Sequence, residues 1–208
     1  MMTIRNTTKK EDIQAAGEVL RKGGIVAFPT DTVYGLGAVY DDAKAVRKIF
    51  AAKGRDEKKP LSILVCDIEQ VTLLSDPSSG TMAEKAQHLM EKYWPGALTL
   101  IFRKKAGIPD EVTAGGDTIG IRMPDLEVTR DLIRAAGKPL AAPSANASGK
   151  RSAVTAEDVL EDLDGKIDML IDGGACDIGV ASTVVDMTGK APVILREGVI
   201  TKEMIDRA

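Results

Sequence analysis

A polar loop over residues 139–152, PLAAPSANASGKRS, holds the densest group of side chains that could bind a small anionic molecule. A short apolar run precedes Pro143, which has no backbone donor and disfavours helix in the residue before it, so a strand should end there. Hydroxyl and amide groups follow, and the loop closes on the cations Lys150 and Arg151. This composition indicates a ligand-binding loop, although an ordinary connector between two elements can have the same composition.

Three further polar segments could contribute to the same chemistry: PTDTVYGLG (29–37), AAKGRDEKKP (51–60) and TAGGDTIGIRMP (113–124). The first offers hydroxyl and carboxylate oxygens, and the second offers Lys53 and Arg55. Taken singly, the first segment is equally typical of a turn. The cations of the second segment could equally serve to complement the C-terminal end of a helix dipole. The third places Arg122 inside an apolar run, where an arginine normally meets a carboxylate of the protein or of a ligand.

Four cations are expected at or near the ends of strands or helices, beside hydroxyl-rich loops: Lys53, Arg55, Arg122 and Arg196. Open α/β sheets bind their ligands at such strand ends. Four positive charges in one cleft repel each other unless an anion neutralises them. The group therefore favours a nucleoside triphosphate, or a nucleotide together with a carboxylate, as the ligand.

Several other kinds of site are disfavoured by the inventory of residues. His88 is the single histidine and lies in a stretch with helical spacing, which argues against imidazole catalysis and against a zinc site built on histidine. Residues 149–152 lack the glycine spacing of a phosphate loop. Cys66 and Cys176 have no metal-binding spacing, and two isolated cysteines are typical of a reducing cytoplasm.

The composition is that of a globular protein that forms one domain over residues 1–208. Apolar residues make up 44% of the chain and charged residues 28%, and the net charge of −3 counts against a protein that works mainly by neutralising nucleic-acid phosphates. A local basic cleft is compatible with that charge. No run approaches the roughly 20 apolar residues of a membrane span, and no signal peptide opens the chain. We expect a cytoplasmic protein without membrane contact.

Helical and strand-like patterns alternate along the chain. Helical spacing is found at 11–22, 41–53, 81–93, 125–136, 155–162 and 201–207. Strand-like runs are found at 25–28, 61–65, 97–102, 119–122, 139–142, 168–171, 182–187 and 193–196. Because the two kinds interleave without a repeat or a linker, the sequence predicts a single α/β domain with a mixed sheet.

Nine motifs occur in the order seen in the YrdC-like family, which the chain resembles from about residue 12 to residue 198. They are PTDTVYGLG, KGR after a helix, PLSILV, YWPGALTLIF, TIGIRMP, APSAN, IDGG, AST and LREG. The resemblance implies a twisted mixed parallel and antiparallel sheet with flanking helices around a concave basic site. Residues 199–208 would form a short C-terminal tail.

The resemblance also implies an enzyme, a nucleotidyltransferase. It would condense L-threonine, bicarbonate and ATP, with Mg²⁺, to threonylcarbamoyl-AMP and pyrophosphate. The product would pass to a tRNA threonylcarbamoyl transferase for the N6-threonylcarbamoyladenosine modification of tRNA. The substrate's carbamate is the nucleophile in this reaction, so the protein needs to supply only alignment and charge neutralisation.

The resemblance assigns site residues motif by motif and leaves the metal ligands unassigned. Contacts to threonine are expected from Thr30, Thr32, Tyr34, Arg122 and Ser182, with Arg122 forked on the carboxylate. Contacts to ATP are expected from Lys53, Arg55, Lys59, Thr118, Ser144, Asn146 and Arg196, of which Lys53 and Arg55 would be catalytic. Arg122→Ala is expected to raise the threonine requirement and leave the fold intact.

The chain departs from the family pattern at two places. Leu64 stands where many relatives have a histidine that contacts the substrate, and longer relatives carry an additional C-terminal domain. Two alternatives stay open beside the synthase. One is a non-catalytic paralogue that binds a nucleotide or, weakly, double-stranded RNA. The other is a carbamoyl-adenylate enzyme of hydrogenase maturation, which the absence of CxxC motifs disfavours.

Overall fold

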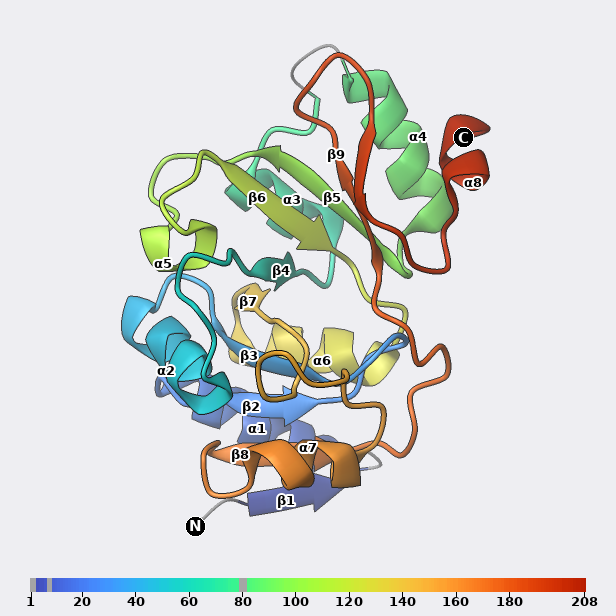
Figure 1. Cartoon of the computed structure of the whole chain (residues 1–208). Helices are drawn as coiled ribbons and strands as arrows, with labels where there is room; N and C mark the ends of the chain where they lie inside the picture. Colours follow the sequence, from blue (N-terminus) through green and yellow to red (C-terminus); the bar gives the residue numbers. More distant parts are fainter. Residues whose placement is uncertain (1–2, 7–8, 79–81) are drawn as a thin grey trace.

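The computed structural model describes residues 3–6, 9–78 and 82–208 (Figure 1). Within these residues ten strands form one sheet in the order β1-β8-β2-β3-β7-β4-β6-β5-β9-β10. The strands are β1 (Thr3–Asn6), β2 (Val26–Phe28), β3 (Gly35–Val39), β4 (Ser62–Leu64), β5 (Leu98–Arg103), β6 (Thr118–Arg122), β7 (Leu140–Ala141), β8 (Met169–Asp172), β9 (Thr183–Asp186) and β10 (Val193–Arg196). The helices are α1 (Lys10–Arg21), α2 (Ala43–Lys53), α3 (Ile68–Leu74), α4 (Ala83–Tyr93), α5 (Asp110–Thr113), α6 (Glu127–Ala136), α7 (Ala156–Leu163) and α8 (Lys202–Asp206).

The sheet is mixed, as the sequence predicts. Parallel pairs join β1 to β8, β2 to β8, β4 to β6 and β5 to β9. Antiparallel pairs join β2 to β3, β3 to β7, β4 to β7, β5 to β6 and β9 to β10. The strands turn progressively across the sheet, so the β1 end and the β10 end lie at different inclinations (Figure 1).

Both faces of the sheet are buried at its strands β2 and β3, and alternate residues of one strand enter different clusters of the core. In β2, Ala27 belongs to the cluster that includes α2, α4 and α7, whereas Val26 and Phe28 belong to the cluster with α1 and α6. This follows from the period of two by which side chains alternate across a strand. On the second face α1 and α6 approach closely, since a Cβ at Gly17 would lie 2.6 Å from the Cβ of Ala135.

Short polar signals fix the ends of the helices that lead to the site. The Asp42 carboxylate accepts from the backbone N–H groups of Lys44 and Ala45, both at 3.0 Å, and so caps α2. At the other end of α2, Gly54 has a φ of 59°, the left-handed conformation that favours glycine. A capping box of Thr155 and Asp158 opens α7.

All six expected helices and all eight expected strands are present, with ends that differ by a few residues. The first residue of the expected helix 81–93 lies outside the described residues. Sequence patterns miss four elements: β1, β3 and the short helices α3 and α5. The strand β3 lies partly in the segment 29–37, for which the sequence predicts a polar turn or a ligand-binding loop. The structure makes Gly35 the first residue of β3, and a Cβ at Gly37 would lie 2.6 Å from the Phe28 ring.

Other expectations from the sequence concern single residues and membrane contact. His88 is exposed on α4. Both cysteines are free. In the part of the chain that the structure describes, no helix has the length and apolar character needed to cross a membrane.

Candidate functional site

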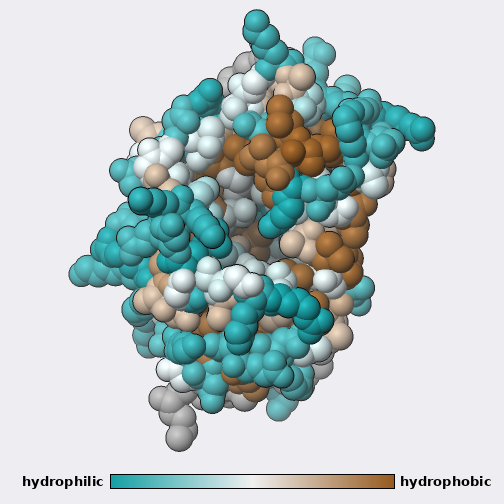
Figure 2. Space-filling model, viewed as in Figure 1, coloured by the Kyte–Doolittle hydropathy of each residue, from teal (hydrophilic) through white to brown (hydrophobic). Residues whose placement is uncertain are grey.

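A cavity of about 190 Å³ opens where loops from both halves of the sheet meet, and a hollow is visible at this place (Figure 2). The loop after β2 and strands β4, β5 and β6 form part of its lining, and the loop after β7, the start of β9 and the end of β10 complete it. Its lining combines three arginines with several hydroxyl groups and a few apolar side chains. This is the concave basic site that the family resemblance implies.

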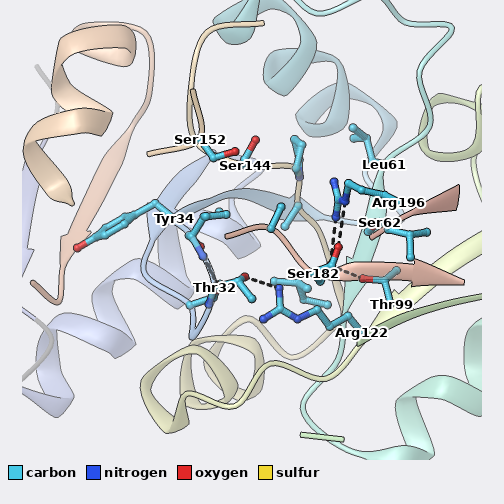
Figure 3. Close-up of a pocket in the computed structure, with 18 of the residues that line it drawn as sticks. Thr32, Tyr34, Leu61, Ser62, Thr99, Arg122, Ser144, Ser152, Ser182 and Arg196 are labelled. Carbon is cyan, nitrogen blue, oxygen red and sulfur yellow. Dashed lines mark hydrogen bonds between the residues drawn. The ribbon is translucent and has the colours of Figure 1, made fainter. Parts of the chain in front are cut away.

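Arg122, the last residue of β6, is buried at the bottom of this lining with three groups around its guanidinium. Nη1 donates to Thr32 Oγ1 at 2.6 Å (Figure 3). Nε donates to the Gly96 carbonyl at 2.9 Å, and Nη2 donates to Asp31 Oδ1. Burial lowers the pKa of Arg122, and the neighbouring Asp31 carboxylate opposes that shift. The carboxylate that the sequence predicted for Arg122 is therefore present in the protein itself.

The loop after β2 is held by a turn around Thr30. Thr30 Oγ1 donates to the Val33 carbonyl at 2.7 Å and accepts from the backbone N–H groups of Thr32 and Val33 at 3.1 and 3.2 Å. The hydroxyls of Thr30 and Thr32 lie 3.0 Å apart. This turn fixes Thr32 at the cavity, beside Arg122.

Tyr34 contributes differently from the expectation. Its ring points away from the cavity (Figure 3), and its hydroxyl donates to the Gly174 carbonyl at 2.8 Å and accepts from the Gly173 N–H at 3.1 Å. Burial raises the pKa of Tyr34 to about 12. The side chain thus anchors Gly173 and Gly174, the two residues of the IDGG segment that follow β8, and Tyr34 is also among the residues that line the cavity.

Ser182 lies just before β9 and links Thr99 of β5 to Arg196 of β10. Its hydroxyl lies 2.8 Å from Thr99 Oγ1 and accepts from Arg196 Nη2 at 3.2 Å, while Arg196 Nε donates to the Ser182 carbonyl at 2.9 Å (Figure 3). Burial lowers the pKa of Arg196. The charge of Arg196 therefore faces the cavity from a position fixed by the AST motif.

The two cations of the KGR motif take different places. Arg55 lines the cavity, donates from Nη2 to the Pro60 carbonyl at 3.1 Å, and has a buried Nε with no hydrogen-bond partner in the described structure. Lys53 is buried and donates from Nζ to the carbonyls of Ser144 and Asn146. Burial, with a smaller contribution from Arg55, lowers the pKa of Lys53 to about 8. Lys53 thus holds the loop after β7.

The structure brings eight of the residues predicted from the sequence to the cavity: Thr30, Thr32, Tyr34, Arg55, Arg122, Ser144, Ser182 and Arg196. Four others lie outside its lining. Lys53 and Asn146 are buried within or under the loop after β7, Lys59 is exposed beside Pro60, and Thr118 starts β6 opposite Arg103.

The sequence patterns leave several polar residues of the site unassigned. Ser62 and Thr99 each interrupt an apolar run, which is the same signal that singles out Arg122, and both line the cavity. Ser152 ends the polar loop 139–152 and also lines the cavity. Asp31 offers carboxylate oxygens in the segment 29–37, but nothing local links it to Arg122, which lies 91 residues further along the chain.

The pairing with Asp31 changes one expectation. Arg122 and Asp31 form a buried ion pair, with each side chain 7% exposed. Removing one partner of a buried pair leaves an uncompensated charge and costs about 3–5 kcal/mol. Arg122→Ala is therefore expected to destabilise the fold as well as the site.

The cavity offers no set of ligands for a metal ion. Its lining includes hydroxyl and guanidinium groups but no carboxylate, and the described residues contain no group of three or more metal-binding side chains. This donor set does not fit a magnesium ion held by the protein, since magnesium prefers carboxylate and phosphate oxygens.

Comparison with known proteins gives a consistent family. The Sua5/YciO/YrdC family model, described as "Telomere recombination", matches residues 18–198. Threonylcarbamoyl-AMP synthase of Bacillus subtilis is 49% identical over 206 residues, which are 99% of this chain and 58% of the relative. The chain thus spans less than two thirds of the length of this relative.

Two solved structures share the fold. Sua5 of Pyrococcus abyssi in complex with L-threonine superposes with a TM-score of 0.93 at 43% identity, over 100% of this chain and 60% of that one. YciO of Escherichia coli superposes with a TM-score of 0.84 at 26% identity, over 96% of this chain and 97% of that one.

Proposed function

The chain belongs to the Sua5/YciO/YrdC family, and we propose that it is an enzyme that forms threonylcarbamoyl-AMP and pyrophosphate from L-threonine, bicarbonate and ATP. The observation that carries the proposal is the buried guanidinium of Arg122 in a cavity lined by Thr32 and Ser182. A forked guanidinium beside hydroxyl groups suits an amino acid that has a carboxylate and its own hydroxyl. The relative from Pyrococcus abyssi, which was solved with L-threonine, supports this choice of substrate.

The size of the cavity agrees with an amino acid and part of a nucleotide. Its volume of about 190 Å³ is below the roughly 300–1,000 Å³ of sites that enclose a drug-sized ligand. Arg55 and Arg196 line the same cavity, and we assign them to the phosphates of ATP. We assign Ser144 to the adenylate part of the nucleotide.

The proposed reaction has two bond-forming steps. The neutral amine of L-threonine attacks the carbon of bicarbonate, and loss of water leaves a carbamate. A carbamate oxygen then attacks the α-phosphorus of ATP while the bond from that phosphorus to the β-phosphate oxygen breaks, which releases pyrophosphate. This is a nucleotidyl transfer, in which the protein contributes alignment and charge neutralisation.

The positions of these residues support the roles that we propose for them. Arg122 would hold the carboxylate so that the amine points toward the phosphate side of the cavity. Arg55 and Arg196 would offset the charge that develops on the pyrophosphate. Lys53 would keep the loop after β7 in place, since its ammonium group binds two carbonyls of that loop. Magnesium enters the proposal only as a counter-ion of the ATP phosphates, and no step is assigned to it.

The remaining parts of the proposal concern the cellular setting. The product would pass to a tRNA threonylcarbamoyl transferase for tRNA modification, and both proteins would act in the cytoplasm. Free cysteines are consistent with that compartment. The competing hypothesis is a nucleotide-binding paralogue without synthase activity, which the 49% identity to a relative named threonylcarbamoyl-AMP synthase does not favour.

Pyrophosphate release from ATP tests the proposed function. Release should require both L-threonine and bicarbonate, and omission of either should reduce it to background. Release that is indifferent to threonine, or the absence of any release although ATP binds, would contradict the proposal and favour the binding paralogue. Leu64→His provides a comparison within the same chain, because it restores the residue that many relatives have at this position.

A further inference from the structure

Asp31 is the one carboxylate that binds the guanidinium of Arg122 among the described residues, and it lies outside the lining of the cavity. Its Oδ1 accepts from Arg122 Nη2 and from the backbone N–H of Asp125 at 3.1 Å. The pair therefore ties the loop after β2 to the end of β6 and to the turn before α6. Arg122, which lines the cavity, thus has its negative partner in a residue that does not line it.

The second oxygen of Asp31 shows that this pair is not arranged for maximum stability. Oδ2 is buried and has no hydrogen-bond partner among the described residues. A buried carboxylate oxygen without a partner costs free energy, and a buried ion pair often stabilises a fold no better than apolar residues of the same size. Stability alone therefore does not explain why this pair is present, and its position next to the cavity suggests a role in ligand binding.

We propose that Asp31 is a positioning residue that acts as the resident counter-ion of Arg122, and that it moderates how strongly the cavity attracts the carboxylate of an incoming amino acid. The inference rests on the proposed function, because it takes that carboxylate as the ligand of Arg122. In the empty site Asp31 compensates the buried guanidinium and keeps it in place. In the filled site the two carboxylates share one guanidinium, and their repulsion limits the affinity.

The other contacts of Arg122 explain why the position survives a change at Asp31. Nε and Nη1 keep the Gly96 carbonyl and Thr32 Oγ1 as acceptors. In Asp31→Asn, the amide oxygen can still accept from Nη2 and from the Asp125 N–H. The variant therefore removes the negative charge with little change in shape, and leaves the substrate's carboxylate as the main partner for the charge of Arg122.

Ligand-dependent thermal unfolding of Asp31→Asn tests this role. Without ligand the variant should unfold at a lower temperature than the parent. With L-threonine its stabilisation should be larger, and the half-saturating concentration should fall by at least about tenfold, because two like charges within about 10 Å of each other repel by more than that factor at an effective dielectric constant near 20. L-threoninol, which lacks the carboxylate, should show no such gain. Asp168→Asn is the matched control, because its carboxylate accepts from the Ile25 N–H at 2.8 Å outside the cavity lining.

The outcomes separate this inference from the proposed function. Equal responses of parent and Asp31→Asn to L-threonine would overturn the counter-ion role and leave the proposed substrate intact. No response of the parent to L-threonine, together with a gain of response to acetate in Asp31→Asn, would contradict the substrate and support the counter-ion role. If Asp31→Asn does not fold alone, L-threonine or acetate should restore the folded protein during refolding and L-threoninol should not. Equal refolding with all three would refute the inference.

Discussion

At the residue scale, the site is built from cations whose positions are fixed by the main chain. Arg196 is held by the Ser182 carbonyl, Arg55 by the Pro60 carbonyl and Lys53 by two carbonyls of the loop after β7. The two arginines line the cavity and keep further N–H donors for a ligand, whereas Lys53 holds the loop beneath it. Preset donors of this kind suit a reaction in which the substrate supplies the nucleophile and the protein supplies charge.

Lys53 carries a prediction about pH. Burial lowers its pKa from the ordinary 10.5 to about 8, so between these values the unfolded chain binds a proton that the folded protein has lost. The contribution of Lys53 should therefore make the free energy of unfolding rise with pH across this window, because the folded state no longer buries its charge. The charge that holds the loop after β7 is lost over the same window, and ATP binding should weaken there.

An ATP titration at pH 7, 8 and 9 checks this prediction. In the parent protein the dissociation constant should rise by up to about tenfold from pH 8 to pH 9, the limit for loss of one required proton. Lys53→Met should bind ATP weakly at every pH and without this trend. Lys59→Met is the control, since Lys59 is an exposed cation of the same segment and should keep the parent's trend. If ATP binding still weakens from pH 8 to pH 9 in Lys53→Met, a group other than Lys53 causes the pH dependence.

At the element scale, the ends of helices and strands decide where the site residues lie. Gly54 illustrates this: its left-handed conformation ends α2 and sends the chain toward Pro60, so that Arg55 turns into the cavity. Any residue with a Cβ is strained at that φ, although the space around Gly54 is open. The position of Arg55 therefore depends on a backbone conformation, and a glycine before a cation is the sequence signal for it.

Gly54→Ala should lower the free energy of unfolding by about 1–2 kcal/mol, the cost of a left-handed conformation for a residue with a Cβ. It should also weaken ATP binding, because relief of the strain shifts Arg55. Gly137→Ala is a matched control: Gly137 ends α6 with a φ of 76°, a Cβ added there would have no neighbouring atom within 4 Å, and the residue lies outside the cavity lining. Urea unfolding and ATP titration of both variants check this. Equal ATP affinities in the two variants would show that the backbone conformation at Gly54 does not affect ATP binding.

Much of the fold could be predicted from local patterns, and the rest depends on contacts between distant residues. Helices such as α1 and α6 are predictable because their apolar residues recur at helical spacing. The strand β3 escapes prediction because GLGAV has two glycines and one β-branched residue, and because one of its two pairing partners, β7, lies about 100 residues away. The pairing of Asp31 with Arg122 escapes it for the same reason, since no local pattern says which buried carboxylate meets which arginine.

At the whole-molecule scale, charge is distributed unevenly. The chain has a net charge of −3, yet the ionisable side chains in the cavity lining include three arginines and no carboxylate. The cavity thus attracts a small anion, while the rest of the surface carries the excess of negative charge. This distribution favours a nucleotide over a long polyanion such as RNA, because RNA must lie against a large part of the surface.

The described part of the cavity also lacks a surface on which bases could stack. Tyr34 is the single aromatic residue in its lining, and its ring points away from the cavity (Figure 3). Aromatic residues make up 3% of the chain, and Trp94 is buried with its indole N–H donating to the Leu98 carbonyl at 2.7 Å. Proteins that bind single-stranded nucleic acid without sequence preference rely on such stacking.

Because the net negative charge outside the cavity opposes contact with RNA phosphates, we expect double-stranded RNA to bind more weakly than the roughly 10⁻⁴–10⁻⁶ M of ordinary non-specific binding at physiological salt. Fluorescence anisotropy with a labelled RNA duplex, measured from 50 to 300 mM salt with and without ATP, checks this expectation. Arg196→Ala should weaken ATP binding and leave the RNA signal unchanged. Tight binding that falls steeply with salt and is lost in Arg196→Ala would show that the cavity is an RNA site, because a contact with an RNA phosphate contributes about one unit to the salt slope. Such a result would show that the basic cavity serves RNA binding rather than catalysis.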